Sequence, residues 1–105
     1  MSNNIKILFW IYKARVNKSG SAPLMVRINY KGQRVQFSTG QFIPLNKWDR
    51  LKVRVRGKDE NAHQINSYIQ NTSNSIRGIF NELLQKEEVN LFELLNRYSG
   101  KNESS

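Results

Sequence analysis

The sequence predicts an α+β fold in which a three-stranded antiparallel β-sheet packs on one long α-helix, followed by a short C-terminal linker helix. Residues 24–30 alternate apolar and polar side chains, as a strand with one covered face does. A Lys31–Gly32 turn then leads into a second alternating stretch. Residues 60–86 space their apolar side chains by three and four, which is typical of an amphipathic helix. A chain of 105 residues fits one domain with one modest core.

The first predicted strand covers residues 5–13, which are rich in β-branched and aromatic side chains. Both of its faces are largely apolar, so it is either central in the sheet or partly covered on both sides. One face carries Ile5, Ile7, Phe9 and Ile11, and the other carries Leu8, Trp10 and Tyr12. Residues 1–4 before it are expected to form a disordered tail, and residues 17–23 have the composition of a loop.

A hairpin around Lys31–Gly32 fixes which side chains share a face. A two-residue loop pairs residues whose numbers sum to 63. In this one register, mostly apolar side chains pair on one face of the hairpin and mostly polar side chains pair on the other. The apolar pairs are Ile28–Val35, Val26–Phe37 and Leu24–Thr39, and the opposite face holds Asn29–Arg34, Arg27–Gln36 and Met25–Ser38. A four-residue loop keeps this register and a three-residue bulged turn does not, so the turn type stays open.

Pro44 and Asn46 end the third strand and begin a turn. Trp48, which follows, is interpreted as an aromatic side chain that closes the core. Residues 51–56 alternate again before Gly57 and form either a short extra strand or an extended arm. Trp10 and Tyr12 either border a DNA surface or pack beneath this arm.

Asp59 or Asn61 can cap the long helix, which ends near Lys86. Its buried stripe is predicted to comprise Ile65, Ile69, Thr72, Ile76, Ile79 or Phe80, and Leu83. Asn90 and Glu93 resemble a capping box that opens a short helix through Tyr98. The predicted organisation is therefore a domain at 5–86, a linker helix within 87–98 and a disordered tail at 99–105.

Charge is distributed unevenly along the chain, whose net charge is +9. Residues 1–58 hold thirteen basic side chains and one acid, Asp49, whereas residues 59–105 hold four basic and seven acidic ones. A basic half beside an acidic half indicates one surface for a polyanion and another that avoids it. The chain has no apolar run long enough to span a membrane and no cysteine, which is compatible with a cytosolic protein.

The sequence offers little for catalysis or for a cofactor. His63 is the only histidine, and no second histidine or cysteine stands at metal-ligand spacing. The basic half has no paired carboxylates, no nucleophile with a base and an orienting acid is recognisable, and the phosphate-binding loop motif is missing. We therefore expect no catalytic residue, metal, cofactor, small-molecule substrate or membrane contact in this chain.

The polar face of the predicted hairpin is the positive signal. Arginine pairs with guanine, and asparagine or glutamine with adenine, in the major groove of DNA. The base-reading candidates are Arg27, Asn29, Arg34 and Gln36. Basic side chains at strand ends and in loops can bind phosphates. The phosphate candidates are Lys13, Arg15, Lys18, Lys31, Arg54, Arg56 and Lys58.

Five segments in this order resemble the N-terminal arm-type DNA-binding domain of tyrosine recombinases, as found in integrases of phages and conjugative transposons. They are Ile-Leu-Phe-Trp-Ile-Tyr-Lys at 7–13, Ala-Pro-Leu-Met-Val-Arg-Ile at 22–28, Gly-Gln-Arg-Val-Gln-Phe-Ser-Thr-Gly at 32–40, Lys-Trp-Asp at 47–49 and Ile-Asn-Ser-Tyr-Ile at 65–69. The resemblance covers roughly residues 5–86 and is specific only as a combination.

The resemblance implies a three-stranded sheet that enters the major groove of accessory arm sites during integration of a mobile element. Arg27, Asn29, Arg34 and Gln36 fall on its groove-facing positions. The catalytic residues of such recombinases belong to a separate C-terminal domain, and this chain lacks their His-x-x-Arg motif. Tyr98 is therefore not expected to be the nucleophile. The implied partners are double-stranded DNA and further domains of the same integrase, with 87–98 leading toward a core-binding domain that is absent from this chain. The resemblance also implies a bacterial cytoplasmic location associated with the nucleoid.

Two other classes of function compete with this interpretation. The first is an RNA-binding module of the double-stranded-RNA-binding or ribosome-associated type, although such modules usually show exposed aromatic pairs or a basic helix. The second is a protein-interaction module with a docking surface on the last helix, made by Leu91, Phe92, Leu94, Leu95 and Tyr98.

Overall fold

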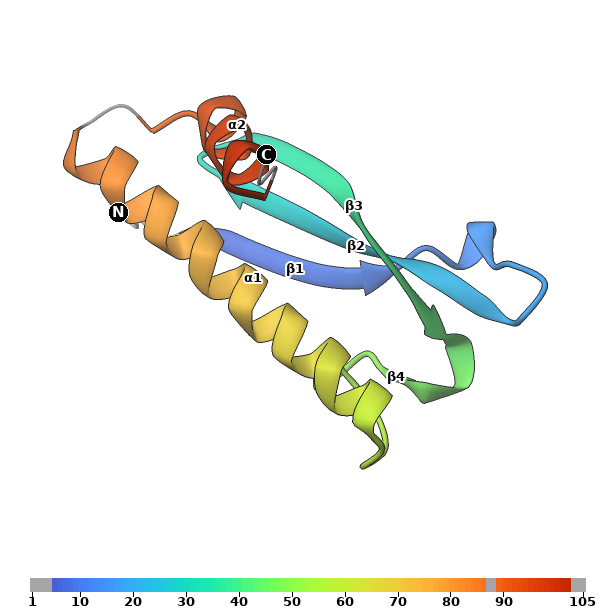
Figure 1. The fold of residues 1–105 in the computed structure, drawn as a ribbon. Coiled ribbons are helices and arrows are strands. Elements are labelled where there is room, and N and C mark those ends of the chain that lie inside the picture. The colour runs from blue at the N-terminus through green and yellow to red at the C-terminus, as the bar shows by residue number, and fades with distance from the viewer. Residues whose placement is uncertain (1–4, 87–88, 103–105) are drawn as a thin grey trace.

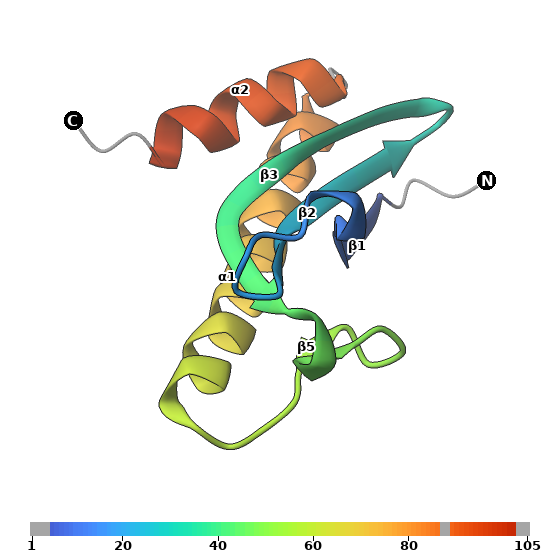
Figure 2. The same cartoon turned by 90° about the vertical axis from the view of Figure 1, so that its right-hand side faces the viewer.

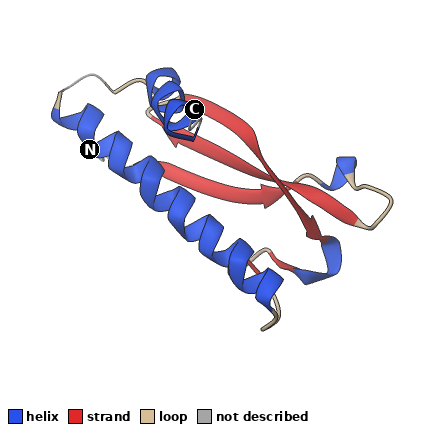
Figure 3. Cartoon of the chain, viewed as in Figure 1, coloured by secondary structure: helices blue, strands red, loops and turns tan. Residues whose placement is uncertain are grey.

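The computed structural model describes residues 5–86 and 89–102 and confirms the predicted α+β architecture (Figures 1 and 3). The elements in chain order are β1 (Lys6–Ile11), η1 (Lys13–Arg15), β2 (Ser21–Tyr30), β3 (Gln33–Pro44), η2 (Leu45–Lys47), β4 (Trp48–Asp49), β5 (Arg54–Val55), α1 (Glu60–Gln85) and α2 (Leu91–Asn102). Residues 1–4, predicted to form a disordered tail, and residues 103–105, the end of the tail predicted at 99–105, lie outside the described residues. Within the described part, neither helix combines the length and hydrophobicity that a membrane crossing requires.

The three-stranded sheet has the order β1-β2-β3, with both neighbouring pairs antiparallel. The predicted hairpin register is confirmed from Tyr30–Gln33 back to Met25–Ser38. Lys31 and Gly32 form a two-residue loop with φ angles of 46° and 84°. Two consecutive positive φ angles are those of a type I′ turn, whose twist suits a hairpin, and this settles the turn type that the sequence left open.

A bulge interrupts the hairpin beyond Met25. The register shifts there, so that Pro23 pairs with Phe42 and Ala22 with Ile43. The predicted Leu24–Thr39 pair is consequently missing from the regular ladder, and the Thr39 hydroxyl instead donates to the Leu24 carbonyl at 2.9 Å. Extra residues on one strand increase its local twist. Accordingly, the ends of β2 and β3 that lie beyond the bulge, away from the hairpin turn, cross and twist away from the rest of the sheet (Figure 1).

Helix α1 lies diagonally across one face of the sheet, and α2 covers the hairpin end of the same face (Figure 1). On the helix-covered face of β2, Ala22, Leu24, Val26 and Ile28 are fully buried. Every predicted position of the α1 stripe, including Ile79 and Phe80, is buried as well. Aromatic contacts join both helices to the sheet: Tyr30 meets Phe80 with ring centroids 5.1 Å apart, and Phe37 meets Tyr98 at 5.7 Å. In the described part of the chain, no helix covers the opposite face (Figure 2).

Helix α2 begins at Leu91, and Asn90 caps it as predicted, because its Oδ1 accepts hydrogen bonds from the backbone N–H groups of Phe92 and Glu93. The Glu93 carboxylate does not complete the predicted reciprocal box and instead accepts from Arg97 Nε at 3.1 Å. The helix also continues through 99–102, which the sequence assigned to a disordered tail. Tyr98, directly before this part, packs against Phe37 of β3, a tertiary contact that local sequence does not reveal.

The remaining segment folds into a small ribbon in which Trp48 pairs with Val55 and Asp49 with Arg54. Within the 51–56 segment, only Arg54 and Val55 form a strand. Of the two alternatives that the sequence left open, the segment is therefore a short strand, which follows a turn, and not an extended arm. Trp48 is buried in the core, as predicted. Asn66 on α1 holds the ribbon by accepting from the Val55 N–H at 2.8 Å and donating to its carbonyl at 3.0 Å.

Candidate nucleic-acid interface

The sheet face that α1 and α2 leave uncovered, called the open face below, consists of three rows of side chains across the strands. Each row takes one residue from β1, one from β2 and one from β3. The rows are Lys6–Asn29–Arg34, Leu8–Arg27–Gln36 and Trp10–Met25–Ser38. Their side chains alternate with the buried ones along each strand. The pairing of β1 with β2 therefore extends the predicted two-stranded face by a third strand.

The middle row brings Arg27 and Gln36 into contact. Arg27 Nε donates to Gln36 Oε1 at 3.2 Å. The Arg27 guanidinium also lies over the Trp10 ring, with Cζ 5.2 Å from the ring centroid. The hydrogen bond and the cation–π contact restrain the guanidinium from two sides, which lowers the entropy that binding a base would cost.

The next row repeats the arrangement with the strands exchanged. Here the arginine is Arg34 on β3, and its Nε donates to Asn29 Oδ1 on β2 at 3.1 Å. In both pairs the hydrogen bond uses Nε, whereas a guanidinium can pair with guanine through its terminal nitrogens. The four base-reading candidates are thus brought together as two arginine–amide pairs in adjacent rows.

Cationic side chains flank the open face at both ends. At one end, Lys13 and Arg15 belong to η1, directly after β1, and Lys18 follows in an exposed turn. Arg15 lies over the Tyr12 ring, with Cζ 5.5 Å from its centroid. At the other end, Lys31 occupies the hairpin turn, with its Nζ 5.4 Å from the Tyr30 ring centroid. These four phosphate candidates therefore stand at the two ends of the open face.

The other three phosphate candidates occupy a different part of the surface. Arg54 and Lys58 line a hollow of about 420 Å³ between the ribbon and the first turns of α1, together with His63. Arg56 pairs with Asp49, with Arg56 Nε 3.9 Å from Asp49 Oδ2. These three side chains do not join the rows of the open face.

Sequence reasoning missed two cations near the open face. Lys6 shares a row with Asn29 and Arg34, and its alternation with Leu8 and Trp10 along β1 was the signal that could have found it. Arg50 borders a hollow of about 410 Å³ that Trp10 and Lys13 also line. Its position depends on the fold of the ribbon, which the sequence left open.

The turn that follows Asp49 stabilises the charged form of its carboxyl. Its Oδ1 accepts hydrogen bonds from the Lys52 and Leu51 backbone N–H groups, both at 3.1 Å. The Lys52 hydrogen bond, helped by the nearby Arg56 charge, lowers the pKa of the Asp49 carboxyl. This carboxylate therefore organises the ribbon turn from which Arg50 projects.

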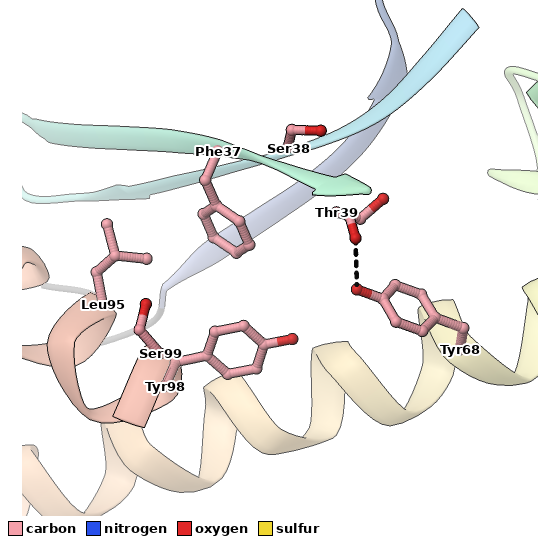
Figure 4. Close-up of a pocket in the computed structure, with 7 residues that line it drawn as sticks. All are labelled: Phe37, Ser38, Thr39, Tyr68, Leu95, Tyr98 and Ser99. Carbon is pink, nitrogen blue, oxygen red and sulfur yellow. Dashed lines mark hydrogen bonds between the residues drawn. The ribbon is translucent and has the colours of Figure 1, made fainter. Parts of the chain in front are cut away.

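A separate hollow of about 360 Å³ lies on the helix side, between β3, α1 and α2 (Figure 4). Phe37, Leu95 and Tyr98 line it, and the Tyr68 hydroxyl at its edge donates to the Thr39 carbonyl at 3.4 Å. Burial is the main cause that raises the pKa of the Tyr68 phenol above its usual value. The lining residues are apolar or uncharged, so this hollow offers no charge to a polyanion.

Helix α2 does not present the docking surface of the protein-interaction alternative. Leu91, Leu94 and Tyr98 are buried within the domain itself, against the sheet and α1. Phe92 alone of that set is strongly exposed, at 65%. The apolar side chains of α2 therefore complete the core.

An open three-stranded sheet that carries arginine–amide pairs and is flanked by cations defines a β-sheet nucleic-acid-binding domain. Compared with known protein families, the chain matches the Arm DNA-binding domain over residues 9–96 and belongs to that family. It is thus a non-catalytic DNA-binding domain, and the family favours DNA over the RNA alternative. Searches of curated proteins and of solved structures gave no significant match.

Proposed function

We propose that the domain recognises specific sequences of double-stranded DNA by placing its open face in the major groove. The observation that carries the proposal is the pair of arginine–amide couples, Arg27–Gln36 and Arg34–Asn29. These residue types match the hydrogen-bonding edges of guanine and adenine, and the couples hold them in adjacent rows on one surface.

The dimensions of the sheet fit this use. The β2–β3 hairpin, which carries both couples, is a two-stranded ribbon whose strands lie about 4.8 Å apart. The major groove of B-form DNA is about 12 Å wide and accepts an α-helix or a two-stranded β-ribbon. The narrow, deep major groove of duplex RNA does not admit side chains in this way.

Phosphate contacts would come from the ends of the face. Lys13, Arg15 and Lys18 lie at one end and Lys31 at the other, so they can contact the phosphates that border the groove. Lys6 and Arg50 extend the cationic surface. The Arg54, Arg56 and Lys58 side chains lie farther round the ribbon and would contribute only if the DNA bends toward α1.

We further propose that this recognition serves a tyrosine recombinase at its arm sites during integration of a mobile element. The resemblance of the sequence segments to integrase arm domains supports this role, as does membership in the Arm DNA-binding domain family. Tyr98 is only 6% exposed and packs against Phe37, which is unsuited to a nucleophile that must reach a phosphodiester. Helix α2 would lead toward the other domains of such an integrase.

Selection from a library of randomised duplexes tests sequence recognition. The proposal predicts an enriched consensus that binds more tightly than a scrambled duplex and far more tightly than the same sequence as duplex RNA. Enrichment of no consensus would contradict sequence-specific recognition. Equal affinity for duplex RNA would contradict the major-groove mode.

The recombinase role has its own test in the reading frame that encodes the chain. Continuation into a domain with His-x-x-Arg and a late tyrosine would support it. A stop codon directly after residue 105 would contradict it.

A further inference from the structure

The open face is polar toward the hairpin and apolar toward η1. The polar part holds Arg27, Gln36, Asn29, Arg34 and Lys6. Beside it lie Leu8 in the Arg27 row, and Trp10 and Met25 in the row nearest η1, which Ser38 completes. Leu8, Trp10 and Met25, together with Phe42 beyond the bulge, are called the apolar patch below. Beyond the bulge, Phe42 pairs with Pro23 on the side opposite to the buried Ala22–Ile43 pair.

Two members of the apolar patch are strongly exposed. Leu8 is 43% exposed and Phe42 is 48% exposed, although both belong to strands whose alternate residues are buried. Trp10 is half-buried and contacts Arg27 on one side and Tyr12 on the other, with the Trp10 and Tyr12 ring centroids 5.4 Å apart. Grouped exposed apolar side chains on a small soluble domain usually mark a contact surface.

The charges around the patch indicate what covers it. Arg27 touches Trp10 from the hairpin side. Lys13 and Arg50 line a hollow with Trp10 on the other side. An apolar patch bordered by cations on both sides fits a polyanion that presents an apolar group.

Only one such group occurs in the major groove of unmodified DNA. Each thymine projects its C5-methyl group there, and apolar side chains recognise it by direct contact. Leu8 lies in the same row as Arg27, so a methyl group against Leu8 would belong to a base pair next to the one that Arg27 contacts.

We propose that the apolar patch is a binding site for thymine C5-methyl groups, with Leu8 and Met25 as the principal contacts. The inference rests on the proposed major-groove function and adds to it a requirement for thymine beside the bases that Arg27 and Arg34 contact. 5-Methylcytosine presents the same methyl group, so unmethylated synthetic duplexes are used and thymine is then its only source.

The first experiment tests the wild-type protein on duplexes with altered bases, and protein variants follow. The full 105-residue chain is titrated with the tightest duplex from the selection, and then with duplexes in which single thymines are replaced by deoxyuridine. Deoxyuridine keeps every hydrogen bond and removes only the methyl group. Loss of one buried methyl contact should weaken binding roughly threefold to fivefold at one or two positions.

Two variants locate the contact on the protein. Leu8→Ala should bind the thymine duplex as weakly as the wild type binds the deoxyuridine duplex, and it should no longer distinguish the two. Phe92→Ala is the matched control, because Phe92 is an exposed apolar residue on α2, away from the open face. This control should keep the full preference for thymine. Should Leu8→Ala fail to fold, the wild-type titrations and a Met25→Ala variant still decide the question.

The outcomes separate this inference from the proposed function. Specific binding that is unchanged by deoxyuridine at every position would overturn the methyl site and leave major-groove recognition standing. A selected consensus without thymine beside the guanine or adenine contacts would do the same. Absence of any sequence preference would instead overturn the proposed function.

Discussion

Arg27 on β2 and Gln36 on β3 face each other across the hairpin, and Arg27 Nε donates to Gln36 Oε1 at 3.2 Å. The adjacent row reverses the arrangement, with Arg34 on β3 donating to Asn29 on β2 at 3.1 Å. The two guanidinium groups therefore stand diagonally on the open face, each held by an amide. Side chains held in this way lose less rotational freedom when they bind a base.

The first prediction concerns salt. If about five basic side chains contact phosphates, the logarithm of the binding constant should fall with the logarithm of salt concentration at a slope of roughly −4 to −5. Titrations of one duplex at several potassium chloride concentrations measure this slope. A flat dependence would contradict a cationic DNA surface.

The second prediction concerns the α1 stripe. Ile76 is fully buried and Ile69 nearly so. Replacing either by alanine removes buried methylene groups and leaves a cavity, which should lower the free energy of unfolding by about 2–5 kcal/mol. Chemical denaturation measures the change, and Arg77→Ala, an exposed neighbour on α1, is the control with an expected change below about 0.5 kcal/mol. A change below about 0.5 kcal/mol at Ile76 would mean that this stripe does not form the core.

The third prediction concerns the attachment of the ribbon to α1. Asn66→Ala removes both hydrogen bonds to Val55, whose side chain is 1% exposed. The two unsatisfied backbone groups should cost about 1–3 kcal/mol of stability. Amide hydrogen exchange should show faster exchange at Val55, with Gln70→Ala on the exposed side of α1 as control. Unchanged protection at Val55 would argue against this clamp.

The fourth prediction concerns acid. Because the folded state lowers the pKa of Asp49 below its usual 3.8, the ionised carboxylate stabilises the ribbon at higher pH. That stabilisation should be complete above the usual value and should be lost as pH falls through the folded-state pKa. Asp49→Asn should remove this part of the acid dependence in unfolding experiments between pH 2 and pH 6, roughly the range where a carboxyl titrates. An unchanged acid dependence would show that Asp49 does not contribute.

Much of the site could be predicted because the pairing register of a hairpin is set locally by its turn. The Lys31–Gly32 turn fixes the register, and the register alone places Arg27 opposite Gln36 and Asn29 opposite Arg34. The pairing of β1 with β2 is not local, so Lys6 was not recognised as a member of the same face. Spacing by three and four likewise predicted the α1 stripe without knowledge of its partner.

Other features depend on tertiary contacts that no local pattern encodes. Helix α2 resembled an exposed docking helix by composition, yet it packs into the core through Leu91, Leu94 and Tyr98. The bulge beyond Met25 shifts the register by two residues, and the only local signal is Gly40, whose φ of 84° favours glycine. The ribbon strands are two residues each, which is too short for a periodicity to appear.

The central claim is that the open face distinguishes base sequence while the flanking lysines supply affinity alone. It is tested by titrating Arg27→Ala, Arg34→Ala and Lys18→Ala against the selected duplex and a scrambled duplex at several salt concentrations. Either arginine variant should lose about 1–3 kcal/mol on the selected duplex and little on the scrambled one. Lys18→Ala should weaken both duplexes alike and make the salt slope shallower by about one unit. If the arginine variants weakened both duplexes equally, the open face would bind phosphates alone and recognition of bases through it would be wrong.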